Sequence, residues 1–129
     1  MARIDSHLHV FPPHSEEFPR QVTEAAPAQR DESVEKLLGE MEANGIDQAV
    51  LTQTGGAGIE DHAYLQYCFK TYPGRFRGIG LIPEDCNDGP GHMDRLAANG
   101  DFIGFRLKRL GGPADPFAPM DVRRFATYP

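Results

Sequence analysis

The chain has 129 residues, 40% hydrophobic and 25% charged, which is the composition of an ordinary globular domain and excludes a disordered or membrane-spanning chain. A formal net charge of −6 at pH 7 argues against a nucleic acid or an anionic membrane as partner, because phosphate groups bind basic surfaces. A small-molecule partner is therefore the better expectation. Asp5 interrupts the N-terminus before an apolar signal core begins, so we expect a cytoplasmic protein.

The first predicted element is a strand over residues 3–10. Its side chains alternate between an apolar and a polar face, Ile4, Leu8 and Val10 against Asp5, His7 and His9. Prolines at positions 12, 13 and 19 then break regular structure, and the segment up to Arg30 has little apolar periodicity. We predict a long loop over this segment.

A helix of about three turns is predicted to follow the loop. Four apolar residues recur there at helical spacing, Val34, Leu37, Leu38 and Met41. Asp31 or Ser33 can cap its N-terminus, and Gly45 is placed to end it after Asn44. The cysteines at positions 68 and 86 are too few for a disulfide framework or a metal-binding motif, so both are expected to be reduced.

The remainder of the chain alternates predicted strands and helices. Strands are predicted at residues 49–52, 76–82 and 102–107, a helix around residues 64–69, a weaker helix at 92–98 and a last helix at 120–127. The glycines at positions 55, 56 and 58 predict a mobile loop after the second strand. They are not a phosphate-binding loop, because no Gly-Lys-Ser/Thr sequence follows them.

The spacing of the strands predicts a parallel sheet. After the long first loop, the strand centres lie a little under about 30 residues apart, which is the size of a βα unit. Four such units are half of a (β/α)8 barrel, which typically needs about 250 residues, whereas a complete small doubly wound domain fits within this length. Length alone favours the doubly wound domain.

The candidate chemistry lies in the first strand. His7 and His9 are two residues apart, so both imidazoles leave one face and can bind one metal ion at about 2.0 to 2.1 Å. Asp5 is predicted on the same face, where it could accept a hydrogen bond from a metal-binding histidine and fix its tautomer. Alternatively, one histidine caps the strand and the other is solvated. The site is favoured because parallel α/β folds gather catalytic residues at strand C-termini.

Four segments in register, Ile4–Phe11, Gly45–Gln53, Tyr72–Gly78 and Ile103–Leu107, span nearly the whole chain. Together they resemble the amidohydrolase superfamily, and specifically the amidohydrolase-related group. That group includes pyrone-dicarboxylate lactonase-like hydrolases and some decarboxylases and hydratases.

The resemblance implies a TIM (β/α)8 barrel fold in the α/β class. Residues 1–129 would then be one partial domain, the N-terminal half with strands one to four, and strands five to eight would be missing. The resemblance also implies a divalent metal, zinc or manganese, bound by His7 and His9 with further ligands from the later strands. Lactonase-like members of the group can also work without a metal.

Arg106 is the candidate substrate anchor. In the strand at 102–107, Ile103, Phe105 and Leu107 are expected on the apolar face, which turns Arg106 toward the barrel interior. By resemblance to lactonase-like hydrolases, an arginine on this strand binds an acidic substrate, which a guanidinium can hold through a bidentate pair. The alternative is an ion pair with a neighbouring acidic residue. Lys108 is expected to be a solvated strand-end residue.

Other polar residues are weaker candidates. Thr52 and Thr54 share one face at the end of the second strand and could bind substrate oxygens, although threonine is also common in strands for structural reasons. His14 and His62 are expected at the surface rather than as ligands, and His92 has no motif around it.

Three functions remain open from the sequence. The first is a hydrolase acting on a small carboxylated lactone, amide or ring by attack of activated water, with His7 and His9 as catalytic and metal-binding residues. The second is an inactive, truncated half barrel that needs a partner half or acts only as a structural module. Its exposed strand edges would favour association, and a homo-oligomer is possible. The third is a small metal-dependent phosphoesterase, but the later strands lack the further ligands that such an enzyme needs. We rank the hydrolase first.

Overall fold

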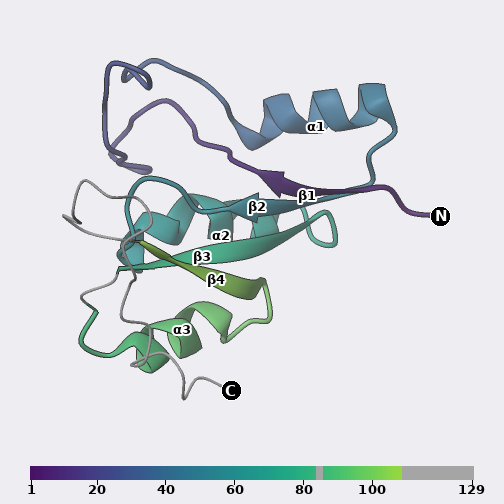
Figure 1. The fold of residues 1–129 in the computed structure, drawn as a ribbon. Helices are drawn as coiled ribbons and strands as arrows, with labels where there is room; N and C mark the ends of the chain where they lie inside the picture. Colours follow the sequence, from purple (N-terminus) through teal and green to yellow (C-terminus); the bar gives the residue numbers. More distant parts are fainter. Residues whose placement is uncertain (84–85, 109–129) are drawn as a thin grey trace, which may run out of the picture.

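The computed structural model describes residues 1–83 and 86–108, whose fold is shown in Figure 1. Four parallel strands form one sheet in chain order, β1 (Ile4–Leu8), β2 (Gln48–Thr52), β3 (Phe76–Pro83) and β4 (Phe102–Lys108). The helices between them are α1 (Val34–Asn44), α2 (Ala63–Thr71) and α3 (Gly89–Ala97), with a 3-10 turn, η1 (Glu60–His62), before α2. The predicted parallel α/β sheet is confirmed. The helix predicted at 120–127 lies outside the described residues.

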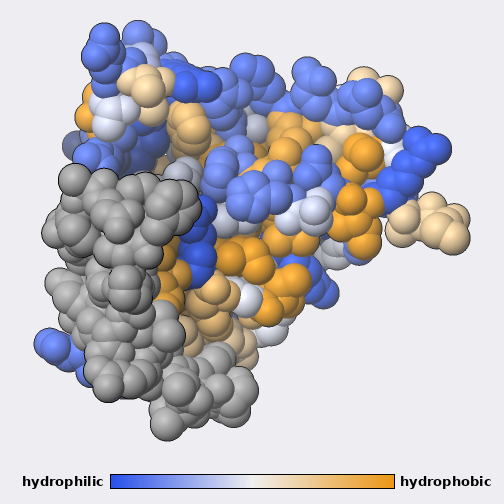
Figure 2. Space-filling view, in the orientation of Figure 1, coloured by the Kyte–Doolittle hydropathy of each residue, from blue (hydrophilic) through white to orange (hydrophobic). Residues whose placement is uncertain are grey.

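The two faces of the sheet differ. In Figure 1, α2 lies behind the sheet, and α1 and α3 run along its two margins. The core fills the space between the helices and the sheet, with Val34, Leu51, Leu65, Cys68 and Ile82 all fully buried. No helix of the described residues covers the opposite face, and Figure 2 shows hydrophobic residues across that open side. None of the helices at 1–83 and 86–108 is long and apolar enough to cross a membrane.

The first helix is capped by a residue from another element. Ser33 occupies the N-cap position of α1 but makes no side-chain capping bond. Instead, the Val34 N–H donates to the Tyr64 hydroxyl at 2.9 Å, which satisfies one of the N–H groups that a helix start leaves unpaired. Gly45 ends the helix in the left-handed conformation, at φ 66°, as its position predicts. Tyr64 therefore ties the start of α1 to α2.

Irregular pairing in β1 changes which residues share a face. The sheet register pairs Asp5 with Ala49 and Leu8 with Leu51, so β1 contains one more residue than β2 between these pairs. Paired residues point to the same face, and both partners are buried, so Asp5 lies on the helix side with Leu8. The prediction that Asp5 shares a face with the histidines is wrong, because a one-residue bulge reverses the alternation.

A similar irregularity corrects the predicted apolar face of β4. The register runs from Gly78 opposite Phe102 to Ile79 opposite Gly104, so Ile103 has no partner in the pairing. Ile103 is 60% exposed, whereas Phe102 is 4% exposed and takes its place in the core. Phe105 and Leu107 pack against the core as predicted.

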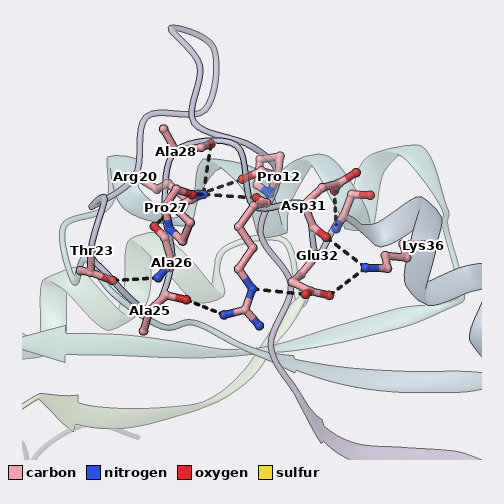
Figure 3. Close-up of polar contacts among 12 residues, drawn as sticks. Pro12, Arg20, Thr23, Ala25, Ala26, Pro27, Ala28, Asp31, Glu32 and Lys36 are labelled. Carbon is pink, nitrogen blue, oxygen red and sulfur yellow. Dashed lines mark hydrogen bonds and ion pairs between the residues drawn. The ribbon is translucent and has the colours of Figure 1, made fainter.

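The predicted long loop, residues 11–30, is organised by the side chain of Arg20. Its three guanidinium nitrogens donate to main-chain carbonyl groups of the loop (Figure 3). The acceptors are Pro12, Gln21, Ala26, Pro27, Ala28 and Arg30, at 2.6 to 3.3 Å. The guanidinium carbon also lies 4.9 Å from the ring centroid of Phe11. One charged side chain thus substitutes for the hydrogen bonds of a regular element.

Candidate functional site

The two histidines of the first strand lie next to each other. His7 lies in β1, His9 is the first residue after the end of β1, and both residues are exposed. Their ring centroids are 4.9 Å apart and the ring planes meet at 82°. Two imidazoles that bind one ion through nitrogens at about 2.0 to 2.1 Å have ring centres about 5 Å apart. The observed separation fits two ligands of one ion.

Thr52, at the end of the neighbouring β2, contacts both rings. His9 Nδ1 lies 2.8 Å from the Thr52 carbonyl oxygen, and since a carbonyl only accepts, this nitrogen carries the proton and donates. His7 Nδ1 lies 3.5 Å from Thr52 Oγ1, at the outer limit of a hydrogen bond. These contacts leave Nε2 of each ring for a ligand. A protein group that holds the far nitrogen in this way fixes the tautomer of a metal-binding histidine.

Within the described residues, Asp5 does not fix the tautomer of either histidine. Its Oδ1 accepts from the main-chain N–H of His7 at 3.1 Å, and no hydrogen bond joins it to an imidazole among residues 1–83 and 86–108. The carboxylate therefore supports the bulged backbone of β1. For His9, the tautomer is fixed by Thr52.

Arg106 lies apart from this group. The register pairs Arg106 with Leu81, on the face opposite to Phe105 and Leu107, and its side chain is exposed. Three strand spacings separate β4 from β1, which is about 14 Å. No ion pair of Arg106 is found in the described part of the chain. Thr54 is exposed just beyond the end of β2. The side chain of Lys108 lies outside the described residues.

The donor set for a metal is incomplete in the described part of the chain. Within residues 1–83 and 86–108, no group of three or more His, Cys, Asp or Glu could hold a metal ion. His7 and His9 supply two nitrogen donors, whereas a catalytic zinc site usually has three protein ligands and an open position. The two histidines suit such an ion in chemistry and spacing, and further donors would have to come from elsewhere.

Burial contradicts the expectation that His62 is a surface residue. Its side chain is fully buried, and both ring nitrogens bond to the main chain. Nε2 accepts from the Leu81 N–H at 2.9 Å, so Nδ1 carries the proton and donates to the Gly58 carbonyl at 2.7 Å. Desolvation by burial lowers the pKa of His62. This neutral ring joins β3 to the loop that precedes η1.

His92 lies on α3 and contacts Cys86. His92 is 7% exposed, its Nδ1 lies 3.5 Å from Cys86 Sγ, and its Nε2 has no partner among the described residues. Burial also lowers the pKa of His92. Cys68 is fully buried, and burial raises the pKa of its thiol to about 12, so it is a core residue rather than a nucleophile. His14 is exposed, as predicted.

Comparisons with known proteins place the chain in a family. A family model described as amidohydrolase matches residues 4–128. Among solved structures, the chain is similar to a probable 2-pyrone-4,6-dicarboxylic acid hydrolase from Acinetobacter baumannii with citric acid bound, at 22% identity and a TM-score of 0.63. The likeness covers 83% of this chain and 38% of that chain, so this chain spans less than half the length of its neighbour. The fold is that of a partial (β/α)8 barrel. No curated protein matches the chain.

Proposed function

This chain belongs to the amidohydrolase family, and we propose that it carries part of the active site of a hydrolase that acts on a small carboxylated lactone, amide or ring. The observation that carries the proposal is the His7 and His9 pair, with 4.9 Å between the ring centroids and Nδ1 of His9 bonded to the Thr52 carbonyl. Two imidazoles with their Nε2 atoms available at a strand C-terminus suit a metal-assisted hydrolase.

We assign the two histidines as ligands of a divalent metal, zinc or manganese. When bound, such a metal polarises a carbonyl oxygen and makes a water molecule nucleophilic near neutral pH. His7 and His9 would hold the ion, and the Thr52 carbonyl would keep the His9 ring in the tautomer whose Nε2 lone pair faces it. Thr52 is 2% exposed, so its contacts with the histidines support a positioning role more than contact with substrate.

Arg106 is our candidate for binding a substrate carboxylate. Its guanidinium is exposed on the face of the sheet that the helices leave open, and it has no ion-pair partner at 1–83 and 86–108. A guanidinium in that position can bind a carboxylate through two parallel hydrogen bonds. Thr54, exposed at the end of β2, is placed to contact other substrate oxygens. The similar structure holds citric acid, a carboxylated molecule, which favours an acidic substrate.

A second candidate function is supported by the open sheet. Within the described residues, β1 and β4 each pair on one side only, and Ile4 and Ile103 are 57% and 60% exposed. Unpaired parallel edges and exposed apolar side chains favour association with further strands. In this alternative, the chain acts as a structural half barrel that needs another half or a second copy, and it has no activity alone.

The first test is metal binding measured together with native mass. The chain is purified without metal and titrated with zinc and with manganese, alongside His7→Ala, His9→Ala and His14→Ala as a matched control. We expect about one ion per chain, loss of binding in the first two variants and unchanged binding in the control. Failure to bind metal, in a species of doubled or undefined mass, would favour the structural alternative.

The second test addresses the substrate class. If the chain or its assembly hydrolyses a carboxylated lactone, Arg106→Gln should raise KM for that lactone more than for its uncharged methyl ester. A KM that changes equally for both compounds would remove Arg106 from the substrate site.

A further inference from the structure

A cavity of about 340 Å³ lies between the loop at residues 11–30 and the start of α2. This volume is within the range of small-molecule sites, which is about 300 to 1,000 Å³. Neither His7 nor His9 lines the cavity, but it borders the candidate site, because Thr54 is one of its lining residues. Val10, whose side chain is buried, contributes to its wall.

Aromatic side chains form much of the cavity wall. Phe11 and Phe18 reach it from the loop, and Tyr64 reaches it from α2. Phe18 and Tyr64 pack edge to face with 5.0 Å between their centroids, and the Tyr64 hydroxyl is held by the Val34 N–H. Hydrogen bonds and ring contacts thus fix these walls.

The polar side of the cavity is also held in place. Gln53 is 8% exposed, and its side-chain amide donates to the carbonyl groups of Thr54, Gly56 and Asp61 at 2.9 to 3.2 Å. This one amide fixes the glycine-containing loop that forms the rim. Despite its glycine content, the loop is therefore held by side-chain hydrogen bonds.

The charges around the cavity do not favour an anion. Arg20 lines it, but all three guanidinium nitrogens of Arg20 already donate to main-chain carbonyl groups. Two carboxylates also line it, those of Glu60 and Asp61. Asp61 accepts from the Gly58 N–H at 2.9 Å, and neither acid forms an ion pair in the described part of the chain.

We propose that this cavity binds a small organic ammonium ion with an aromatic or aliphatic body. The apolar body would lie against the wall that Phe18 and Tyr64 form, and the ammonium group would lie toward Glu60 and Asp61. Aromatic rings attract cations through their electron-rich faces, and the attraction adds to that of the two carboxylates. The ligand class is opposite in charge to the acidic substrate that Arg106 would bind, so the proposal does not rest on the proposed hydrolase function, although Thr54 borders both sites.

Three probes of nearly equal size test the proposal: benzylamine, benzyl alcohol and benzoate. Their dissociation constants are measured by titration of the 15N-labelled chain, followed by NMR. We expect benzylamine to bind at least about threefold more tightly than benzyl alcohol, with benzoate weakest. The shifted signals should come from Gly55, Gly56 and Tyr64. Equal or tighter binding of benzoate, or no binding of benzylamine to the folded chain, would overturn the proposal.

Single and double variants test whether the probes bind in this cavity. Glu60→Gln combined with Asp61→Asn should remove the preference for benzylamine over benzyl alcohol, whereas Glu42→Gln, on the exposed face of α1, should keep it. Ala26→Leu, which narrows the cavity, should weaken binding of both probes. His7→Ala should leave both dissociation constants unchanged. A loss of preference in Glu42→Gln as large as in the double variant would show that only the overall charge matters.

Discussion

Two pairs of histidines in this chain have opposite surroundings. His7 and His9 are exposed at the end of an edge strand, and each contacts Thr52 through one ring nitrogen. His62 and His92 are buried, and His62 uses both nitrogens to bond main-chain groups of two different segments. An exposed ring with one nitrogen available can serve a ligand, whereas a buried ring with both nitrogens occupied serves the fold. Burial therefore separates the two pairs, whereas occupied ring nitrogens distinguish only His62, because Nε2 of His92 has no partner among the described residues.

The largest expected difference between the two pairs of histidines is in their contribution to the free energy of unfolding. It is measured by removing one histidine from each pair. His62→Ala should lower the free energy of unfolding by about 3 kcal/mol, because it leaves a cavity and two buried main-chain groups without partners. His7→Ala should change it by less than about 0.5 kcal/mol, since the side chain is exposed. Urea denaturation followed by circular dichroism measures both. Similar losses in the two variants would contradict the division into structural and ligand-binding histidines.

Metal affinity should depend on the exposed pair of histidines and not on the buried pair. His9→Ala should weaken zinc binding by at least about a hundredfold, because even loss of an outer partner of a metal-bound histidine costs ten- to a hundredfold. His92→Asn should leave zinc affinity unchanged, since His92 lies buried on α3, away from the exposed pair. Isothermal titration calorimetry of each folded variant provides the measurement. An equal loss in His92→Asn would mean that the buried pair also contributes to the zinc site.

The pH dependence of stability should arise mainly from the buried pair. Burial lowers the folded-state pKa of His62 and of His92, so below about pH 6.5 the unfolded chain takes up protons that the folded chain does not. The contribution of the two histidines to the free energy of unfolding should be fully present above this pH. Below it, the free energy of unfolding should fall by at most about 1.4 kcal/mol per pH unit for each group. The loss should stop once the pH is below the folded-state pKa values. Unfolding of the chain and of His62→Asn, measured from pH 8 to pH 5, should show a shallower fall in the variant.

The smallest expected effect concerns Thr52. Thr52→Val removes Oγ1, which lies 3.5 Å from His7 Nδ1, but keeps the carbonyl that holds His9. Zinc affinity should therefore fall by only about two- to threefold, as expected for a hydrogen bond at its outer limit. Competition with a chelating dye can resolve this change, and Thr54→Val is the matched control. A tenfold loss would mean that the hydroxyl, rather than the carbonyl, is the main support of the pair.

Much of the fold is predictable from the spacing of apolar residues and from the residues that end helices and strands. The apolar residues of α1 and the glycine at position 45 correctly define that helix, and the strand spacing correctly predicts a parallel sheet. The bulges at Asp5 and Ile103 are not predictable, because an alternating pattern contains no sign of an inserted residue. The start of α3 is also earlier than its apolar pattern indicates. Asp88 caps it by accepting from the Gly91 N–H, and a proline follows in the first turn.

The candidate site is predictable only in part. The spacing of His7 and His9 correctly predicts that the two rings lie together, although the irregular pairing of β1 lies between Asp5 and Leu8 and so includes His7. The contact with Thr52 depends on the register between β1 and β2, which no local pattern specifies. His62 was misplaced because its partners, Gly58 and Leu81, come from a loop and from another strand.

The guanidinium of Arg20 has a consequence for how the loop at residues 11–30 can move. Its hydrogen bonds run to carbonyl groups near both ends of the loop, from Pro12 to Arg30, so the two ends cannot separate without breaking hydrogen bonds of this side chain. Lysine cannot replace it, since a single ammonium has no planar fork to reach acceptors on several sides. One side chain therefore holds the two ends of the loop together, although the loop has no helix or strand of its own.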